Sequence, residues 1–444
     1  MAENPKPPSA DELARRLLET SETRLPTSGV GRLMRMAGTA ARAGFSSGVG
    51  RLLGRETVDL ATVEQLVRSV GELKGVAMKL GQILSYADDS LPPEVRELLS
   101  VLQTHSQPLP FPSIEAVIRK ELGERAGPLL ATLERKPVAA ASIGQVHRAR
   151  LPDGTEVAVK VQYPGIETAL RAELKAAGAG ARLAKVLMPG GDVEGFIGEA
   201  RERMLAECDY RSEAAWQARF GELFARHPVI SVPPVYTDFS ARRVLTTGWQ
   251  PGQSFAAWLA GHPSQDERNR LGVALFEFYV GMLYRSGVFN ADPHPGNYLF
   301  PGDGRMVVLD YGCVREFSPE QVRAYAALGE AVRRDAPESI HDALRALGAT
   351  RAPSAKRENT VRNILRAFFA PTLEDRPTRI QPGAGVSMSR LFADKRAMMG
   401  LGLPGSLLFL FRIKFGLYGV LARIGAEANW YRLERGWAEA IPAR

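Results

Sequence analysis

Residues Val288–Cys313 read VFNADPHPGNYLFPGDGRMVVLDYGC and place two acids among loops and short strands. The loop Asp292–Asn297 holds too much proline and glycine to be the interior of a helix or a central strand. Tyr298–Phe300 predicts a short strand. The apolar run Met306–Leu309 predicts a buried strand, and Asp310 stands at its end. The stretch therefore predicts a loop and a strand pair that present two acids at defined positions.

The spacing of three polar side chains in this stretch matches the needs of phosphoryl transfer. Asn297 follows Asp292 by five positions, and Asp310-Tyr311-Gly312 follows the second strand. Protein kinases arrange an acid, an amide and a metal-binding acid as D-x-x-x-x-N followed by D-F-G. We therefore predict that Asp292 orients or deprotonates the acceptor, and that Asn297 and Asp310 bind Mg²⁺ on ATP. An Asx-rich turn beside an ordinary strand is the alternative.

A second segment, Pro137–Tyr163, has the alternation of half-buried strands. Val146–Arg150 and Thr155–Val161 alternate apolar and polar residues on either side of a Pro-Asp-Gly turn. Lys160 ends a V-A-V-K run, the position from which a kinase lysine reaches the nucleotide phosphates and pairs with a helix glutamate. A solvated edge lysine is the alternative.

Two further segments flank this predicted nucleotide site. Where a kinase carries a glycine-rich loop, this chain has Ala139, Ala140, Ala141 and Ser142. Because alanine does not adopt positive φ cheaply, we expect a stiffer loop. The other segment contains Thr247, Gly248 and Trp249. It is placed either to connect two lobes and hydrogen-bond an adenine, or to form an ordinary loop between a strand and a helix.

Composition sets the broad class of the protein. The 444 residues suffice for roughly two to three domains, and 45% of them are hydrophobic. Two distant cysteines, Cys208 and Cys313, exclude a disulfide framework and favour a reducing compartment. The formal charge of +8 suits an anionic partner. We find neither a signal peptide nor an apolar run of about 20 residues, and predict a protein that is cytoplasmic or peripheral on the inner face of the membrane.

The N-terminal region combines a polar tail, residues 1–28, with a segment that holds arginines but no acid. Its arginines are Arg32, Arg35, Arg42, Arg51 and Arg55. The segment Gly29–Arg55 suits either a basic helical arm packed on its own protein or an amphipathic segment on an anionic membrane. Both interpretations stay open.

Helical periodicity follows, and one helix carries Lys79-Leu80-Gly81-Gln82. A glycine inside a helix costs about 1 kcal/mol relative to alanine, so Gly81 indicates close packing. The segment Val193–Phe224 also predicts a helix, with acids that could partner Lys160 or Lys79. These acids are Glu207, Asp209 and Glu213.

The sequence after Gly312 argues against an ordinary protein kinase. Only five residues separate Gly312 from Ser318, which begins a helix as its N-cap. No long activation loop and no A-P-E motif follow, although protein kinases use that segment to hold a peptide. The remainder predicts helices, the last of them Leu407–Tyr431.

Taken in order, these motifs resemble those of the UbiB/AarF family of atypical kinases, which includes mitochondrial coenzyme Q kinase-like ATPases. They are K-x-G-Q at Lys79–Gln82, the alanine-rich loop, Glu207-Cys208-Asp209, D-x-x-x-x-N and D-Y-G. The resemblance runs from about Arg32 to the C-terminal helices. It departs in two places, since D-Y-G replaces D-F-G and the transmembrane hairpin of many bacterial members is not evident.

The resemblance implies an α+β, two-lobed protein-kinase-like fold with a helical N-terminal extension. It implies a tail at 1–28, an extension at 29–135, an N-lobe at 136–250 and a helical C-lobe at 251–444. It also implies a lid in which Lys79 and Gln82 face Glu207 and Asp209, while Glu213 pairs with Lys160. In the family the alanine-rich loop restrains autophosphorylation.

The resemblance further implies an ATP- and Mg²⁺-dependent kinase or ATPase that supports isoprenoid-lipid, ubiquinone-like metabolism at a membrane. A small-molecule phosphotransferase of the aminoglycoside or choline kinase type is an alternative, and so is an ATP-switched pseudokinase scaffold. We expect ATP, an anionic or isoprenoid lipid and a membrane surface as partners, and no nucleic acid. The substrate and the oligomeric state stay open.

Overall fold

The structure, a computed structural model, describes residues 108–141, 143–168, 170–171, 205, 207–350, 355–381 and 405–441. The predicted tail, the arginine segment, the K-x-G-Q motif and Ser142 lie outside these residues.

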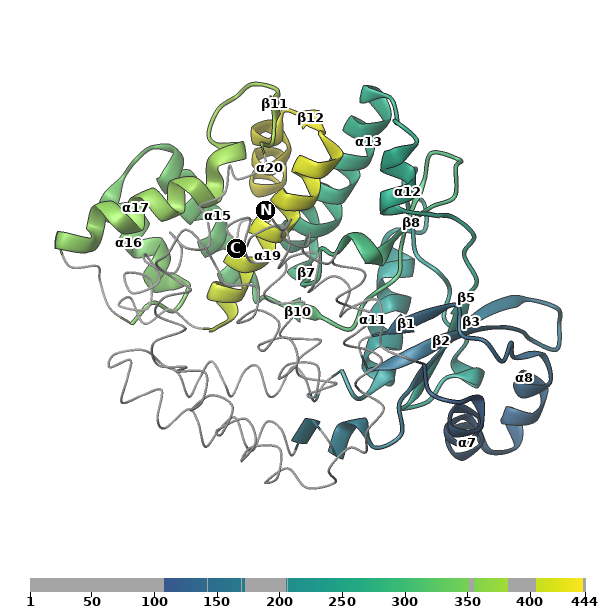
Figure 1. The fold of residues 1–444 in the computed structure, drawn as a ribbon. Helices are drawn as coiled ribbons and strands as arrows, with labels where there is room; N and C mark the ends of the chain where they lie inside the picture. Colours follow the sequence, from purple (N-terminus) through teal and green to yellow (C-terminus); the bar gives the residue numbers. More distant parts are fainter. Residues whose placement is uncertain are drawn as a thin grey trace, which may run out of the picture.

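A four-stranded antiparallel sheet forms one side of the molecule (Figure 1). Its strands, in spatial order, are β1 (Ala139–Ala141), β2 (Gly144–Arg150), β3 (Glu156–Gln162) and β5 (Val244–Gly248). The alternation predicted from the sequence is present in β3, where Val157, Val159 and Val161 are buried. Lys160 lies on the opposite face from these valines because successive strand residues alternate.

Two helices cover the valine face of this sheet, and a third lies against the other face. The covering helices are α7 (Phe111–Leu122) and α8 (Ala126–Thr132), whose buried side chains share one apolar cluster with the β3 valines. The helix on the other face is α11 (Tyr210–Leu223), which reaches Lys160. The sheet therefore presents Lys160 between itself and α11.

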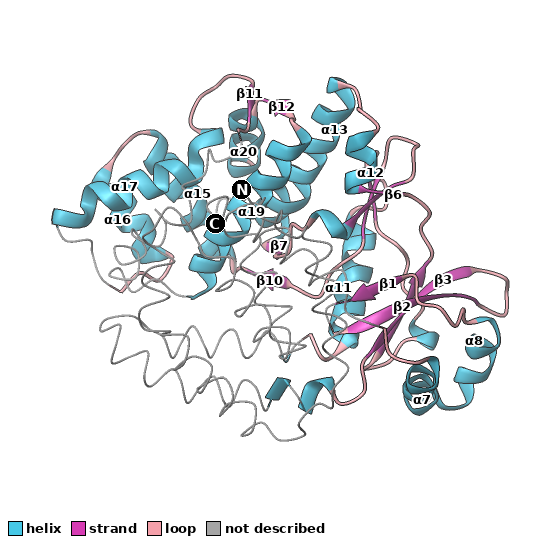
Figure 2. Ribbon diagram, viewed as in Figure 1, coloured by secondary structure: helices cyan, strands magenta, loops and turns pink. Residues whose placement is uncertain are grey.

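The rest of the described chain is mainly helical (Figure 2). Its helices are α12 (Phe255–Ala260), α13 (Gln265–Phe276), α14 (Met282–Ser286), α15 (Pro319–Arg333), α16 (Pro337–Ala346), α17 (Ala355–Phe369), α19 (Gly405–Ile424) and α20 (Trp430–Glu439). One π-helical turn, Glu277–Gly281, joins α13 to α14. Short 3₁₀ turns lie at Gly123–Arg125, Thr237–Phe239, Pro295–Asn297 and Ala370–Thr372.

Three small sheets complete the α+β architecture of the residues that the structure describes. The strands β4 (Ile230–Ser231), β9 (Met306–Val308), β8 (Tyr298–Phe300) and β6 (Gln253–Ser254) form one in that order. The strands β7 (Val288–Asn290) and β10 (Val314–Glu316) pair with each other, and the D-x-x-x-x-N loop and D-Y-G lie between them in the sequence. The strand β11 (Thr378–Arg379) pairs with β12 (Glu427–Ala428). The two strands predicted within Val288–Cys313 are therefore present, as β8 and β9.

Two helix boundaries predicted from periodicity were wrong. The predicted helix Leu407–Tyr431 breaks at Gly425, whose φ of 70° is the left-handed conformation that ends helices. Asn429 then caps α20 by accepting a hydrogen bond from the Arg432 N–H. Lys414 of α19 pairs with Glu434 of α20 at 3.1 Å, a contact that one straight helix would prevent.

The second wrong boundary lies before α11. The predicted helix Val193–Phe224 is interrupted in its described part, because Glu207-Cys208 form a turn. The Asp209 side chain accepts a hydrogen bond from the Arg211 N–H and so begins α11 at Tyr210.

Among the described residues, no helix combines the length and the apolar character that crossing a bilayer requires.

Candidate active site

Lys160 and Glu213 form an ion pair between β3 and α11. The Lys160 Nζ donates to Glu213 Oε1 at 2.8 Å and to Oε2 at 3.0 Å. The same ammonium lies 3.9 Å from Asp310 Oδ2. Asp209 begins α11 four residues before Glu213, so the carboxylate projects from the first turn of the helix toward the sheet. The strand lysine, the helix glutamate and the acid of D-Y-G therefore meet at one point.

The protein favours the charged form of Lys160 but not that of Glu213, as the pKa shifts of the two residues show. Burial disfavours the Lys160 ammonium, but Glu213, Asp310 and Tyr210 outweigh it and raise the pKa of Lys160 well above its usual value. The Glu213 side chain is only 5% exposed and has Asp310 and Glu207 nearby. Burial raises the pKa of Glu213 to about 7 against the opposing effect of Lys160. Lys160 is therefore cationic near neutral pH, while burial weakens the preference of Glu213 for its charged form.

Asn290 connects the two acids that the sequence singled out. Its Nδ2 donates to the backbone carbonyl of Asp310 at 2.9 Å, and its Oδ1 accepts from the Asp292 N–H at 3.0 Å. The side chain is 1% exposed. A buried carboxamide with both arms bonded fixes the backbone at both acids, and the Gly312 N–H donates to Asp310 Oδ1 at 2.9 Å to orient the second carboxylate.

Two tyrosines support the loop that carries Asp292 and Asn297. Tyr279 comes from the π-helical turn, and its hydroxyl donates to the Asp292 carbonyl at 3.1 Å. The hydroxyls of Tyr279 and Tyr298 are 2.8 Å apart. Asn297 Nδ2 donates to Asp292 Oδ2 at 3.1 Å and to the Asp292 carbonyl at 3.2 Å. The D-x-x-x-x-N loop is therefore closed on itself and anchored to the helical core.

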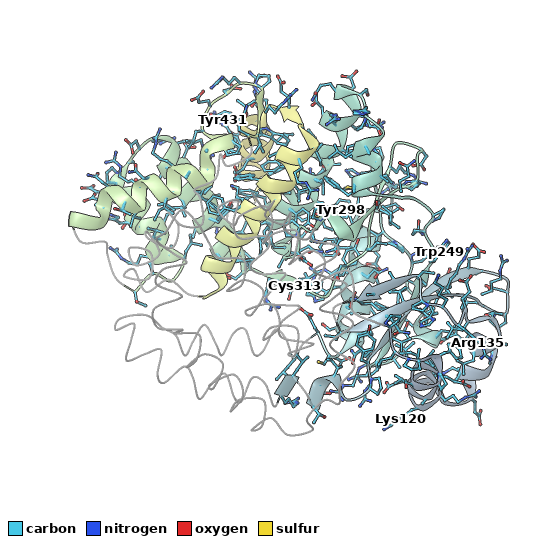
Figure 3. The ribbon with its side chains drawn as sticks, viewed as in Figure 1. Lys120, Arg135, Trp249, Tyr298, Cys313 and Tyr431 are labelled. Carbon is cyan, nitrogen blue, oxygen red and sulfur yellow. The ribbon has the colours of Figure 1, made fainter. Side chains whose placement is uncertain are left out.

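One cleft gathers most of these side chains. Its lining residues are Ile143, Lys160, Glu207, Tyr210, Glu213, Asp292, Asp310, Gly312 and Cys313. Figure 3 shows Cys313, one of these lining residues, near the centre of the molecule. The cleft therefore lies where the two halves of the chain meet.

Asp310 and Asn297 have the donor chemistry that Mg²⁺ prefers. With its Nδ2 bonded to Asp292, Asn297 keeps an amide oxygen for another contact, and Asp310 supplies a carboxylate. Within the described residues, no group of three or more His, Cys, Asp or Glu side chains is arranged as a metal cage. Mg²⁺ is ordinarily held by one or two protein oxygens together with substrate phosphates and water, so these residues fit a metal that arrives with a nucleotide.

The alanines that replace a glycine-rich loop form a strand. Ala139, Ala140 and Ala141 pair with Val146, Gln145 and Gly144 in a tight hairpin. None of the three has positive φ. A Cβ on Gly144 would lie 2.2 Å from the Val161 carbonyl oxygen, so the hairpin is pressed against β3. This segment is extended and sheet-bonded in its described part, and Ser142 lies outside that part.

The residues Thr247, Gly248 and Trp249 lie at the end of β5 and just beyond it. The Gly248 N–H donates to the Pro234 carbonyl at 2.8 Å, and the Trp249 N–H donates to the Glu156 carbonyl at 2.9 Å. The Arg148 guanidinium carbon lies 4.8 Å from the centroid of the Trp249 ring. Because these two N–H groups donate to carbonyls of the protein itself, they are not free to donate to an adenine. The prediction of adenine binding therefore concerns the other backbone groups of the segment.

The remaining predicted residues divide into two groups. Glu207 lines the cleft, whereas Asp209 caps α11 and pairs with Arg211 at 2.6 Å. Lys79 and Gln82, the residues predicted to face them, lie outside the described part of the chain.

Sequence reasoning missed Asn290, Tyr279 and Tyr298. Asn290 stands two residues before Asp292, and this proximity was the one available signal. Tyr279 and Tyr298 looked like ordinary core residues in the sequence. Their hydroxyl contacts join segments that are 13 to 19 residues apart, and such contacts leave no local pattern.

The fold and the cleft define a protein of the protein-kinase-like class, with a strand lysine, a helix glutamate and D-x-x-x-x-N and D-Y-G segments around one cleft. The chain belongs to the ABC1 atypical kinase-like family, whose model matches residues 101–342. The AarF domain-containing protein kinase 1 of Xenopus tropicalis is 29% identical over 264 residues, 58% of this chain and 50% of that protein. The resemblance predicted from the sequence, and the kinase-like α+β fold, are confirmed.

Two other known proteins are similar to most of the chain. The mitochondrial atypical kinase COQ8 of Schizosaccharomyces pombe is 33% identical over 288 residues, 64% of this chain and 46% of the relative. The solved structure of the Rv3197–erythromycin complex from Mycobacterium tuberculosis has a TM-score of 0.58 and 30% identity, and covers 86% of this chain and 95% of that one. The chain spans about half the length of the two curated relatives named here.

Proposed function

We propose that this protein is an ATP- and Mg²⁺-dependent phosphotransferase or ATPase of the UbiB type. The observation that carries the proposal is the convergence of Lys160, Glu213, Asp292 and Asp310 on one cleft. A scaffold without turnover has no need of an acid at the acceptor position in addition to the phosphate and metal groups.

Each of these residues has a chemical task in the proposed reaction. Lys160, held by Glu213, would bind nucleotide phosphates as a fixed positive charge. Asn297 and Asp310 would hold Mg²⁺, which supplies charge neutralisation at the transferred phosphoryl group when bound. Asp292, with its backbone fixed by Asn290 and Tyr279, would orient the attacking hydroxyl or water. Catalysis would then rest on positioning and electrostatic stabilisation.

We further propose that the reaction supports isoprenoid-lipid metabolism, such as that of ubiquinone-like lipids, at a membrane surface. Two observations support this step. The chain resembles a family whose members are tied to ubiquinone and other isoprenoid lipids, and the acid-free segment Gly29–Arg55 has the composition of a membrane-surface segment.

ATP hydrolysis measured with and without Mg²⁺, and with and without anionic vesicles and lipid extract, tests the proposal. Asp310→Asn should abolish turnover. Asp303→Asn is a matched control, because Asp303 is an exposed turn residue of the same stretch that pairs with Arg305. Nucleotide binding without turnover would identify an ATP-switched scaffold. Turnover that requires choline or an aminoglycoside would identify a small-molecule phosphotransferase. Absence of nucleotide binding would refute the proposal.

Erythromycin is a second ligand to include in these binding measurements. The reason is the similarity to the erythromycin complex, which extends over 95% of that chain.

A further inference from the structure

Tyr210 is a buried tyrosine at the start of α11 whose hydroxyl has no hydrogen-bond partner among the described residues. The residue is 1% exposed. Within the described part of the chain, no group donates to or accepts from its Oη. The other tyrosines that surround the catalytic-type loops are bonded, since Tyr279 and Tyr298 contact each other and Tyr311 donates to the Val308 carbonyl at 3.2 Å. Tyr210 is therefore the exception among these neighbours.

The body of the Tyr210 side chain is held by apolar neighbours. It packs in a small cluster with Ile143, Leu170, Cys208 and Leu245. The hairpin that carries Ile143 and the strand that carries Leu245 both belong to the four-stranded sheet. The ring is thus fixed between the sheet and α11, and its position does not depend on a hydrogen bond.

The polar surroundings of Tyr210 are those of the cleft. Tyr210 is one of the cleft-lining residues, and the Lys160 Nζ lies 5.0 Å from its ring centroid. Burial raises the pKa of Tyr210 far above its usual value, and Lys160, Glu213, Asp310 and Glu207 are the charged groups that act on it. These four residues also line the cleft. The ring therefore lies against the cleft, and its hydroxyl is a protonated donor.

A buried hydroxyl without a partner destabilises the protein, and a ligand that accepts from it removes that penalty. Glu213, a cleft-lining carboxylate on the same helix as Tyr210, is already occupied by Lys160 at 2.8 and 3.0 Å. The acceptor that suits this end of the cleft is therefore an oxygen brought by a ligand. Lys160 and Asp310 lie at this end of the cleft, where the proposed function places the phosphates and the metal.

We infer that Tyr210 is a ligand-binding residue whose hydroxyl donates to a phosphate oxygen of the nucleoside di- or triphosphate. The inference rests on the proposed function, because it needs a nucleotide in this cleft. It adds a neutral donor to the charged phosphate contact of Lys160, supplied by the same helix that carries Glu213.

Tyr210→Phe tests the inference, since it removes only the hydroxyl and keeps the packed ring. Mg·ADP affinity is measured by calorimetry, adenosine affinity by competition with a fluorescent nucleotide, and Tm without ligand. Tyr418→Phe is the matched control, because its buried hydroxyl donates to the Phe368 carbonyl at 3.1 Å. Tyr210→Phe should bind Mg·ADP about tenfold more weakly, with unchanged adenosine affinity and an unchanged or higher Tm. Tyr418→Phe should lower Tm by about 1–3 °C and leave Mg·ADP affinity unchanged.

Each other outcome has a defined meaning. Unchanged Mg·ADP affinity in Tyr210→Phe would overturn the inference and leave the proposed function standing. A lower Tm without ligand would show that the hydroxyl serves the fold, and would also overturn it. An equal loss for adenosine would place the effect on the base and reject the phosphate contact. If the parent protein binds no Mg·ADP, the proposed function itself fails, and the inference fails with it.

Discussion

Removing either partner of the Lys160–Glu213 pair should have unequal consequences for stability. Lys160 lies 2.8 Å from Glu213 and 3.9 Å from Asp310. At an effective dielectric constant of about 20 these attractions amount to ~6 and ~4 kcal/mol. They are opposed by a desolvation penalty of several kcal/mol for each buried ion, so neither figure is a net stabilisation.

Lys160→Met removes the cation and leaves Glu213 and Asp310 together without a counter-charge. Breaking a buried pair in this way costs about 3–5 kcal/mol of unfolding free energy. Glu213→Gln instead leaves the ammonium with Asp310 and an amide oxygen. It also removes the burial penalty that raises the pKa of Glu213 to about 7. We therefore expect Glu213→Gln to change stability by less than about 1 kcal/mol.

The pH dependence gives a second test of the same reasoning. In the folded state the pKa of Glu213 lies above its usual value of 4.5. Without Lys160 it should rise further, so the folded state binds more protons than the unfolded chain and is stabilised as the pH falls. The penalty of Lys160→Met should therefore be smaller at pH 6 than at pH 8.

Urea unfolding of the parent, both single variants and the double variant at the two pH values measures these effects. The double variant should recover most of the loss caused by Lys160→Met, since it no longer buries the unpaired Glu213 charge. Arg345→Met is the control, because its pair with Asp342 is about 70% exposed on both sides and should not affect unfolding. The reasoning is refuted if Glu213→Gln destabilises as strongly as Lys160→Met at pH 8, or if the Lys160→Met penalty grows at pH 6.

Four further outcomes are expected. Asp310→Asn should bind Mg·ADP with little remaining Mg²⁺ dependence in calorimetry, and parent-like binding would remove Asp310 from the metal site. Ala140→Gly should loosen the hairpin and raise autophosphorylation or alter the preference between ADP and ATP, measured with labelled ATP; no change in either would exclude the loop from the mechanism. The Nδ1 of His294 accepts a hydrogen bond from the Gly296 N–H, and burial lowers the pKa of His294 to about 4. The unfolded chain therefore binds more protons than the folded protein between pH 6.5 and 4. Up to about 3 kcal/mol of unfolding free energy is lost on acidification through this range. His294→Asn can accept the same bond without titrating and should flatten this part of the unfolding profile, whereas an unchanged profile would assign the loss to other groups. Finally, Gly29–Arg55 should direct sedimentation with cardiolipin or phosphatidylglycerol vesicles in a salt-sensitive manner, and equal binding to neutral vesicles would contradict an electrostatic contact.

The parts of the site that sequence could predict are those written in short local patterns. Lys160 stands at the end of an alternating strand, and Asp292, Asn297 and Asp310 lie within one stretch of 26 residues. The structure brings Lys160, Asp292 and Asp310 to one cleft together with Glu213, while their roles stay proposals.

The remainder depends on contacts between distant segments. Asn290 reaches Asp310 across 20 positions, and Lys160 approaches the Tyr210 ring across 50. Neither contact leaves a local pattern. The wrong helix Leu407–Tyr431 has another cause, because the stop signal at Gly425 and the cap at Asn429 were present but the apolar periodicity continued across them.

The helix α11 links the ion pair to the D-Y-G segment at two places on one face. Near its start, Glu213 lies against Gly312: a Cβ added to this glycine would lie 3.5 Å from Glu213 Oε2 and 3.4 Å from Asp310 Oδ1, both ordinary contact distances. Two turns later, Phe220 packs on the buried Tyr311 ring with centroids 5.2 Å apart. A displacement of α11 would therefore disturb Lys160 and Asp310 together. The structure accommodates the tyrosine of D-Y-G, since its ring packs against Phe220 and its hydroxyl donates to the Val308 carbonyl at the end of β9.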